Sequence, residues 1–257
     1  MKKLLLALLL LASPVHAATT EEIFALYAKG DYEQAVKAGE AAKTAPGYAI
    51  AARAVLADAV LRDRPCMECL TRAETLARQA VAADPRHAFG QVWLAVALGY
   101  QSRITGVVRA RLRDAPGQSK TALDAAVAAD PRNPFAVSAL GGWHIEIVRG
   151  GGAYLARLLY GATETEALAL LDRAVKLAPA NVAVHYQIAL SLLGFDERKY
   201  RARIQGELRA AIAAEPATSY EKAMQARASE LLGLVNRGAT DALEAKVRIF
   251  QGYPDQE

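Results

Sequence analysis

The string AVAADPRHAF (residues 80–89) recurs almost letter for letter as AVAADPRNPF (residues 126–135). Two degenerate copies follow, AVKLAP at 174–179 and AIAAEP at 211–216. In each copy an alanine precedes a proline by five residues. A small alanine lets two helices approach closely, and proline ends a helix because its nitrogen has no hydrogen to donate. The repeat therefore predicts a series of helices, each ended by a proline. These prolines are Pro85, Pro131, Pro179 and Pro216.

The residues before each proline form a ladder of small and apolar side chains at helical spacing. Ala73, Ala77 and Ala80 precede the first proline. The matching sets are Ala167, Leu171 and Ala174, then Ile204, Leu208 and Ala211. This ladder is the second-helix pattern of the tetratricopeptide repeat, and the chain resembles that family. Residues 29–46 follow the turn-then-helix sequence pattern of a first repeat unit. The resemblance implies a right-handed α-solenoid of about five helix pairs.

Two repeat units are too long for this pattern. The intervals from Pro85 to Pro131 and from Pro131 to Pro179 both exceed the roughly 34 residues of a standard unit. We expect the excess to form two inserted short helices, within 103–117 and 149–163. Because the insertions occupy equivalent places in consecutive units, stacking brings them side by side on one edge. Their arginines are Arg103, Arg109, Arg111, Arg113, Arg149 and Arg157.

The arginine-rich first insertion has two interpretations. In one, it is a solvated amphipathic helix whose Ile104, Val108 and Leu112 pack against the body of the protein. In the other, its arginines form an anion-attracting rim over the concave face. In the second insertion, Leu155, Leu158 and Leu159 give an apolar stripe.

The N-terminus and the composition indicate an exported all-α protein. Residues 1–17 have two lysines, a short apolar run and small residues before Ala18, as in a cleaved secretory signal peptide, and a bacterial, periplasmic location follows. Removing this segment lowers the formal charge from +4 to +2, which argues against nucleic-acid binding. No other long apolar run predicts a membrane anchor. Residues 18–257 then form one helical repeat domain, with closing helices at about 219–250.

The stretch ALGGWHIEIVRGGGAYLARLLYGAT (139–163) supports a closer resemblance. Leu140, Gly141, Trp143 and Glu146, followed by Tyr160-Gly161, are similar to the regulator of microtubule dynamics family over residues 126–179. That family's eukaryotic members are repeat-built binding and tethering proteins without an established active site. The resemblance implies a binding role, and the predicted export argues against a microtubule role here.

Candidate binding residues gather on the first helices of the units and on the insertions. Trp143, Glu146 and Arg149 would form the floor of a ligand groove. In the alternative interpretation, Trp143 belongs to the core and Glu146–Arg149 is a helix ion pair worth a few tenths of a kcal/mol. The full set of groove candidates is Trp93, Tyr100, Arg103, Trp143, Glu146, Arg149, Tyr154 and Arg157.

The sequence offers no convincing catalytic or metal site. His144 and Glu146 are two residues apart, so a helix turns them away from each other, and they lack the spacing of a metal-binding pair. The glycines at 150–152 follow a helix, whereas a phosphate-binding loop follows a strand. We therefore expect a protein that is not an enzyme and has no cofactor.

Cys66 and Cys69 are a second pair of side chains with reactive chemistry, besides His144 and Glu146. In an oxidising compartment, two cysteines at this spacing are expected to close a local disulfide at the start of a helix. A redox-active pair is the alternative, although the strand that precedes such a motif in thioredoxins is missing. A zinc site would need two more ligands that the sequence does not provide.

These observations favour a non-catalytic scaffold that presents a concave helical groove to a protein or peptide partner. The alternative is a small-molecule binder in which the insertions at 103–117 and 149–163 roof the groove over a lipid or an organic anion. The two hypotheses predict different shapes. An apolar cavity under the insertions, lined by Trp143 or Tyr154, favours the small ligand, whereas an open groove favours the peptide.

Overall fold

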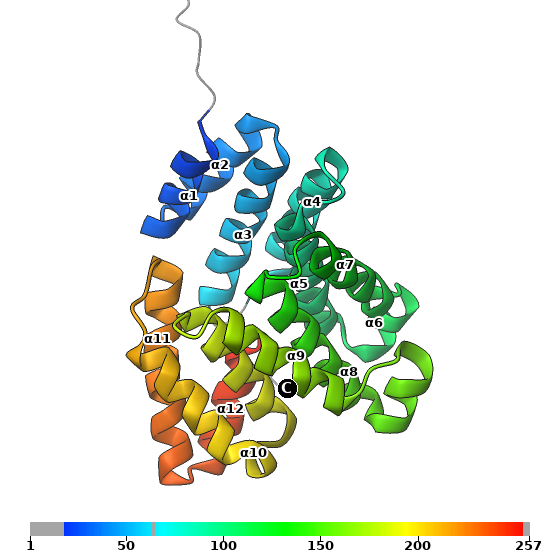
Figure 1. Cartoon of the computed structure of the whole chain (residues 1–257), viewed down its shortest axis with the longest axis vertical. Coiled ribbons are helices and arrows are strands. Elements are labelled where there is room, and N and C mark those ends of the chain that lie inside the picture. The colour runs from blue at the N-terminus through cyan, green and yellow to red at the C-terminus, as the bar shows by residue number, and fades with distance from the viewer. Residues whose placement is uncertain (1–17, 63–64, 254–257) are drawn as a thin grey trace, which may run out of the picture.

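The computed structural model describes residues 18–62 and 65–253, and all regular elements in these ranges are helices (Figure 1). The predicted signal peptide lies outside the described residues. The helices are α1 (Thr20–Lys29), α2 (Tyr32–Ala42), α3 (Ala45–Leu61), α4 (Met67–Ala83), α5 (Ala88–Thr105), α6 (Val107–Leu112), α7 (Ala115–Ala129), α8 (Pro134–Tyr160), α9 (Glu164–Leu177), α10 (Val182–Ala213), α11 (Ser219–Arg237) and α12 (Thr240–Phe250). The all-α prediction is confirmed.

The repeated strings form the same turn between helices. Asp84 and Asp130 each accept a hydrogen bond from the backbone N–H two residues later, at 2.9 and 3.0 Å. The next helix then starts with a side-chain cap. The Nδ1 atom of His87 accepts from the N–H of Gly90 at 3.1 Å, and Oδ1 of Asn133 accepts from that of Ala136 at the same distance. These caps satisfy N–H groups that have no partner within the helix.

The alanines of the repeat lie where the sequence predicts close helix contact. Ala80, Ala126, Ala174 and Ala211 are all fully buried. A second close approach is made by Gly141 of α8, where an added Cβ atom would lie 2.8 Å from Leu171 Cδ2 and 3.2 Å from the carbonyl oxygen of Ala167. A larger residue at this position would push α8 away from α9.

The helices are arranged as an inner row that turns back on itself. Helices α1, α3, α5, α8 and α10 follow one another in contact, while α4, α7 and α9 pack against the row. Helix α11 continues from α10 and contacts both α1 and α3 (Figure 1). Ser219 Oγ donates a hydrogen bond to the carbonyl oxygen of Lys29 at 2.7 Å across this contact. The first and last inner helices therefore meet.

Both predicted insertions contain a short helix. The first is α6, and the second is the last part of α8, which follows a break at Gly152 with φ 72° and ψ 158°. The prediction that Val108 and Leu112 pack inward is wrong, since these side chains are 74% and 82% exposed. Helix α6 has only six residues, and Ala110 is its buried residue. Among the described residues, no helix is both long and apolar enough to cross a membrane.

A buried ion pair links the two halves of α10, which bends at Asp196. His185 Nδ1 lies 2.6 Å from Glu207 Oε2, and its Nε2 lies 2.9 Å from the carbonyl oxygen of Pro179. Both partners accept hydrogen bonds, so both ring nitrogens donate and the imidazole carries a proton on each. The hydrogen bond to Glu207 accordingly raises the pKa of His185, despite the opposing effect of burial.

The His87 cap gives a prediction with a control taken from the repeat itself. His87→Ala should lower the free energy of unfolding by about 1 kcal/mol, because the Gly90 N–H loses its acceptor. His87→Asn should retain most of that stability, since asparagine caps the equivalent helix at Asn133. Urea denaturation at neutral pH measures both. An equal loss in the two variants would show that the cap is not what stabilises this turn.

The cap should also depend on pH. Burial lowers the pKa of His87 below its ordinary value of 6.5, because it disfavours the charged ring. The neutral ring is the form whose Nδ1 accepts the hydrogen bond. Its contribution is therefore complete above about pH 6.5 and is lost as the pH falls through the lowered pKa.

The His185–Glu207 pair predicts the opposite pH dependence. Because the pKa of His185 is raised in the folded state, its contribution is complete below about pH 6.5 and is lost as the pH rises through the raised value. We expect His185→Gln to cost about 2 kcal/mol at acidic pH and clearly less in alkaline solution. The measurement is urea denaturation of both proteins over that range. A difference that stays constant with pH would contradict a charged His185.

Candidate functional site

A cavity of about 580 Å³ lies inside the row of inner helices. Its walls come mainly from α3, α5, α8 and α10, and α6 and the end of α8 contribute from the two insertions. Most of the lining is apolar. Representative lining residues are Leu56, Val60, Val96, Trp143, Ile147 and Ile188. The volume is within the range of about 300–1,000 Å³ that is typical of small-molecule sites.

Arg53 of α3 is a cation in this apolar lining. Its guanidinium carbon lies 4.4 Å from the ring centre of Tyr27 and 5.3 Å from that of Trp93. The rings of Phe135 and Phe24 are 5.4 and 5.6 Å away. Aromatic faces attract cations, so these rings hold the guanidinium in place. Arg53 forms no ion pair with a carboxylate of the described residues. Its positive charge is therefore not neutralised by a carboxylate of the described residues.

The other end of the cavity holds a paired charge cluster. Glu146 of α8 lies 3.2 Å from Arg103 of α5 and 2.6 Å from Arg149, and the hydroxyl of Tyr253 donates to the same carboxylate at 3.1 Å. Arg103 also donates to the carbonyl oxygen of Gln251 at 2.9 Å. The cluster thus binds α5, α8 and the segment after α12 together.

The charges and hydrogen bonds around Glu146 favour the ionised form of its carboxylate. Burial alone would raise the pKa of Glu146, but the charges of Arg103 and Arg149 and the hydrogen bonds from Arg149 and Tyr253 bring it below the ordinary value. Glu146 is therefore charged in the folded protein at neutral pH. The charge of Glu146 is balanced by two arginines, whereas Arg53 has no carboxylate partner among the described residues.

Six of the eight candidates from the sequence line the cavity. They are Trp93, Tyr100, Arg103, Trp143, Glu146 and Arg149. Tyr154 and Arg157 do not line it, and Tyr154 is 77% exposed. The break at Gly152 redirects the final turns of α8, so that Ala156 and Leu155 face the cavity while Tyr154 and Arg157 face solvent.

Trp143 combines the two roles that the sequence left open. It is 8% exposed and lines the cavity, and its Nε1 donates to the carbonyl oxygen of Pro116 at 3.1 Å. The neighbouring His144 is buried, with its Nδ1 accepting from the N–H of Thr163 at 3.1 Å. Burial lowers the pKa of His144, so its ring is a neutral acceptor that connects α8 to the start of α9.

Sequence reasoning missed Arg53 and Tyr253. A usable signal for Arg53 was present, because it is the only basic residue in α3, an alanine-rich helix that is mostly buried. Tyr253 had no such signal. It follows the last helix and reaches Glu146 across a sequence separation of 107 residues.

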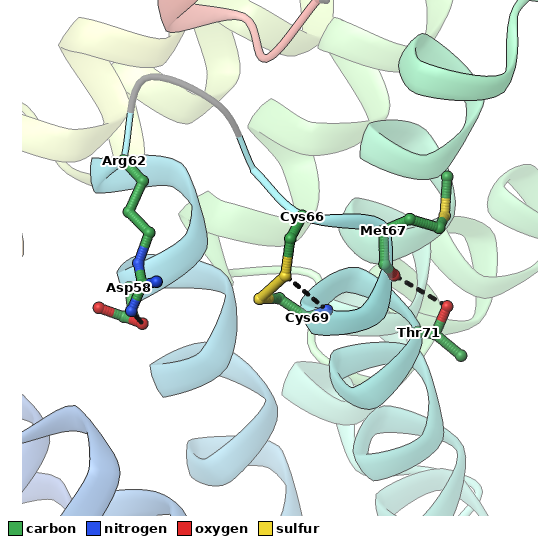
Figure 2. The surroundings of a disulfide bond; sticks show 6 residues. All are labelled: Asp58, Arg62, Cys66, Met67, Cys69 and Thr71. Carbon is green, nitrogen blue, oxygen red and sulfur yellow. Dashed lines mark hydrogen bonds and ion pairs between the residues drawn. A yellow bond between two sulfur atoms is a disulfide. The ribbon is translucent and has the colours of Figure 1, made fainter.

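The two cysteines form the expected disulfide at the start of α4 (Figure 2). The Sγ atom of Cys66 also accepts a hydrogen bond from the N–H of Cys69 at 3.0 Å, which caps the helix. Neither cysteine lines the cavity. In the part of the chain that the structure describes, no group of three or more His, Cys, Asp or Glu residues is placed to hold a metal ion.

The charge cluster gives a stability prediction. Glu146→Gln leaves Arg103 and Arg149 without their common anion in a partly buried site, and we expect a loss of about 2 kcal/mol in the free energy of unfolding. Glu244→Gln, at an exposed position of α12, is the matched control and should change little. The Glu146 contribution is complete above about pH 4.5 and is lost as the pH falls through its lowered pKa. Urea denaturation at several pH values tests both statements, and equal stability of the two variants would contradict them.

Comparison with known proteins gives one family. The family described as regulator of microtubule dynamics protein 1-3 matches residues 20–236, well beyond the stretch on which the resemblance was first based. No curated protein matches the chain. The matched range starts with α1 and ends within α11, so it includes the helices that surround the cavity. The chain belongs to the regulator of microtubule dynamics family.

Proposed function

We propose that this chain is a non-catalytic binding protein that holds a small amphipathic anion in its cavity. In this proposal the helices are tetratricopeptide-like pairs of a strongly curved α-solenoid, and residues 1–17 direct the protein to the periplasm. The observation that carries the proposal is the apolar cavity containing Arg53, a cation held by aromatic rings and not paired with a carboxylate.

The dimensions and chemistry of the cavity support this ligand class. From Trp93 to Arg103, α5 lines the cavity over about 15 Å, given the 1.5 Å rise per residue of a helix. An extended aliphatic chain fits a channel of that length and is bound by burial of its apolar surface. An acidic group at one end of the ligand would supply the anion that Arg53 lacks, by charge-assisted hydrogen bonds.

The scaffold hypothesis receives less support than the small ligand. It expects an open groove, whereas the first and last inner helices meet and the insertions line the same cavity as Trp143. A cavity of this size accommodates a small ligand, whereas an extended peptide needs a longer open groove. We therefore favour the hypothesis in which the insertions roof the site.

Intrinsic fluorescence provides a direct test, because the chain has two tryptophans, Trp93 and Trp143, and both line the cavity. Titration of the mature protein with dodecanoate should change this fluorescence saturably. Arg53→Gln should weaken dodecanoate binding by roughly tenfold to a hundredfold, through loss of a charge-assisted contact. Binding of dodecanol, which has the same chain and no charge, should be nearly unchanged.

Arg86→Gln is the matched control, because it removes the same charge from an exposed turn outside the cavity. Its dodecanoate affinity should equal that of the wild type. If neither dodecanoate nor dodecanol changes the fluorescence, the cavity is not an aliphatic site. If Arg53→Gln weakens both ligands equally, Arg53 does not recognise the anion.

A further inference from the structure

The exposed apolar side chains of the protein are concentrated on the two insertions. Among the described residues, the large hydrophobic side chains that are exposed lie on α6 and on the end of α8, apart from Phe24. We call this surface the insert face. Its residues are Val107, Val108, Leu112, Tyr154, Leu155, Leu158 and Leu159. Five of them are at least 65% exposed: Val107, Val108, Leu112, Tyr154 and Leu158 are 68%, 74%, 82%, 77% and 65% exposed. Such a group of exposed apolar side chains marks an interaction surface.

The charges on the insert face have one sign. Arg109, Arg111, Arg113 and Arg157 are exposed and form no ion pair with the carboxylates of the described residues. No acidic residue occurs from Arg103 to Arg113 or from Arg149 to Thr163. Elsewhere on the protein, some exposed arginines, such as Arg62 and Arg72, are paired with carboxylates. The insert face is therefore complementary to a surface that is negatively charged and accepts aliphatic side chains.

The insert face is continuous with the cavity. Val107, Leu155 and Leu159 of this face also line the cavity, as does the exposed Arg111 of α6. Whatever covers the insert face thus covers the entrance that these residues form. An anionic phospholipid bilayer satisfies all three observations, because its interface takes up apolar side chains, its phosphates pair with arginine, and its interior is an apolar phase next to the cavity.

We propose that the insert face docks the protein on the surface of an anionic phospholipid bilayer. The aliphatic side chains of α6 and of the end of α8 enter the interface, and the arginines between them bind lipid phosphates. The docking rests on the insert face alone. Its consequence, exchange of an apolar ligand between bilayer and cavity without passage through water, rests on the proposed function.

The experiment is flotation of the mature protein with lipid vesicles. Vesicles of phosphatidylcholine should bind weakly, and vesicles in which about a third of the lipid is phosphatidylglycerol should bind strongly, with a marked decrease at high salt. Leu112→Ser combined with Leu158→Ser should lower the partition coefficient about tenfold. Arg109→Gln combined with Arg113→Gln should lower it by about tenfold or more, since each basic residue near an anionic surface contributes separately.

None of these four residues lines the cavity, so each variant should bind dodecanoate as the wild type does. Arg86→Gln combined with Arg132→Gln removes two exposed arginines from the turns between helices and is the matched control for charge. Its partition coefficient should stay within about twofold of the wild type.

Two results would overturn the docking proposal. One is a wild type that does not float with the phosphatidylglycerol vesicles, or floats equally well after the leucine substitutions. The other is self-association that the leucine substitutions abolish, without flotation, which would assign the insert face to a second copy of the chain. Dodecanoate binding is measured in the absence of vesicles, so failure of docking and failure of the proposed ligand site are distinguished.

Discussion

The contact of α11 with α1 and α3 determines the shape of the interior. Arg227 of α11 is buried and donates to the carbonyl oxygens of Val60 and Leu61 at 3.1 Å each, at the C-terminal end of α3. These carbonyls have no partner within the helix, and a cation is favoured at this end of a helix dipole. The guanidinium also lies 4.4 Å from the ring centre of Phe250 in α12. Because this contact joins the end of the helix row to its start, the row curves around the cavity.

Two arginine sites in that space differ in how their charge is balanced. Arg103 and Arg149 share the carboxylate of Glu146, so their N–H groups are used to hold α5, α8 and the C-terminal segment in place. Arg53 is held by aromatic rings instead, which position the guanidinium without neutralising it. The first arrangement stabilises the walls, and the second leaves a charge that a ligand can use. This difference in pairing is why we propose Arg53, and not Arg103 or Arg149, as the arginine that binds a ligand.

Sequence reasoning was successful where the information is local. The alanine–proline repeat predicted helix ends, and the spacing of the insertions predicted both short helices, because caps and breaks depend on neighbouring residues. It was wrong about Val108 and Leu112, because helical periodicity shows which residues share a face but not what that face contacts. It also did not predict that α11 meets α1 or that Tyr253 reaches Glu146. Those contacts join residues that are 190 and 107 positions apart, so no local sequence pattern indicates them.

The meeting of α1 and α11 also affects how the protein unfolds. In an open array of repeats, each unit contacts only its neighbours, so terminal units fray and the array can melt progressively from either end. Here the hydrogen bond from Ser219 to Lys29 and those from Arg227 to α3 connect the two ends, so neither end is free to fray first. Such long-range contacts also carry a high loop-closure cost and slow folding. A protein assembled from locally specified helix pairs thereby gains the cooperativity of a single globular unit.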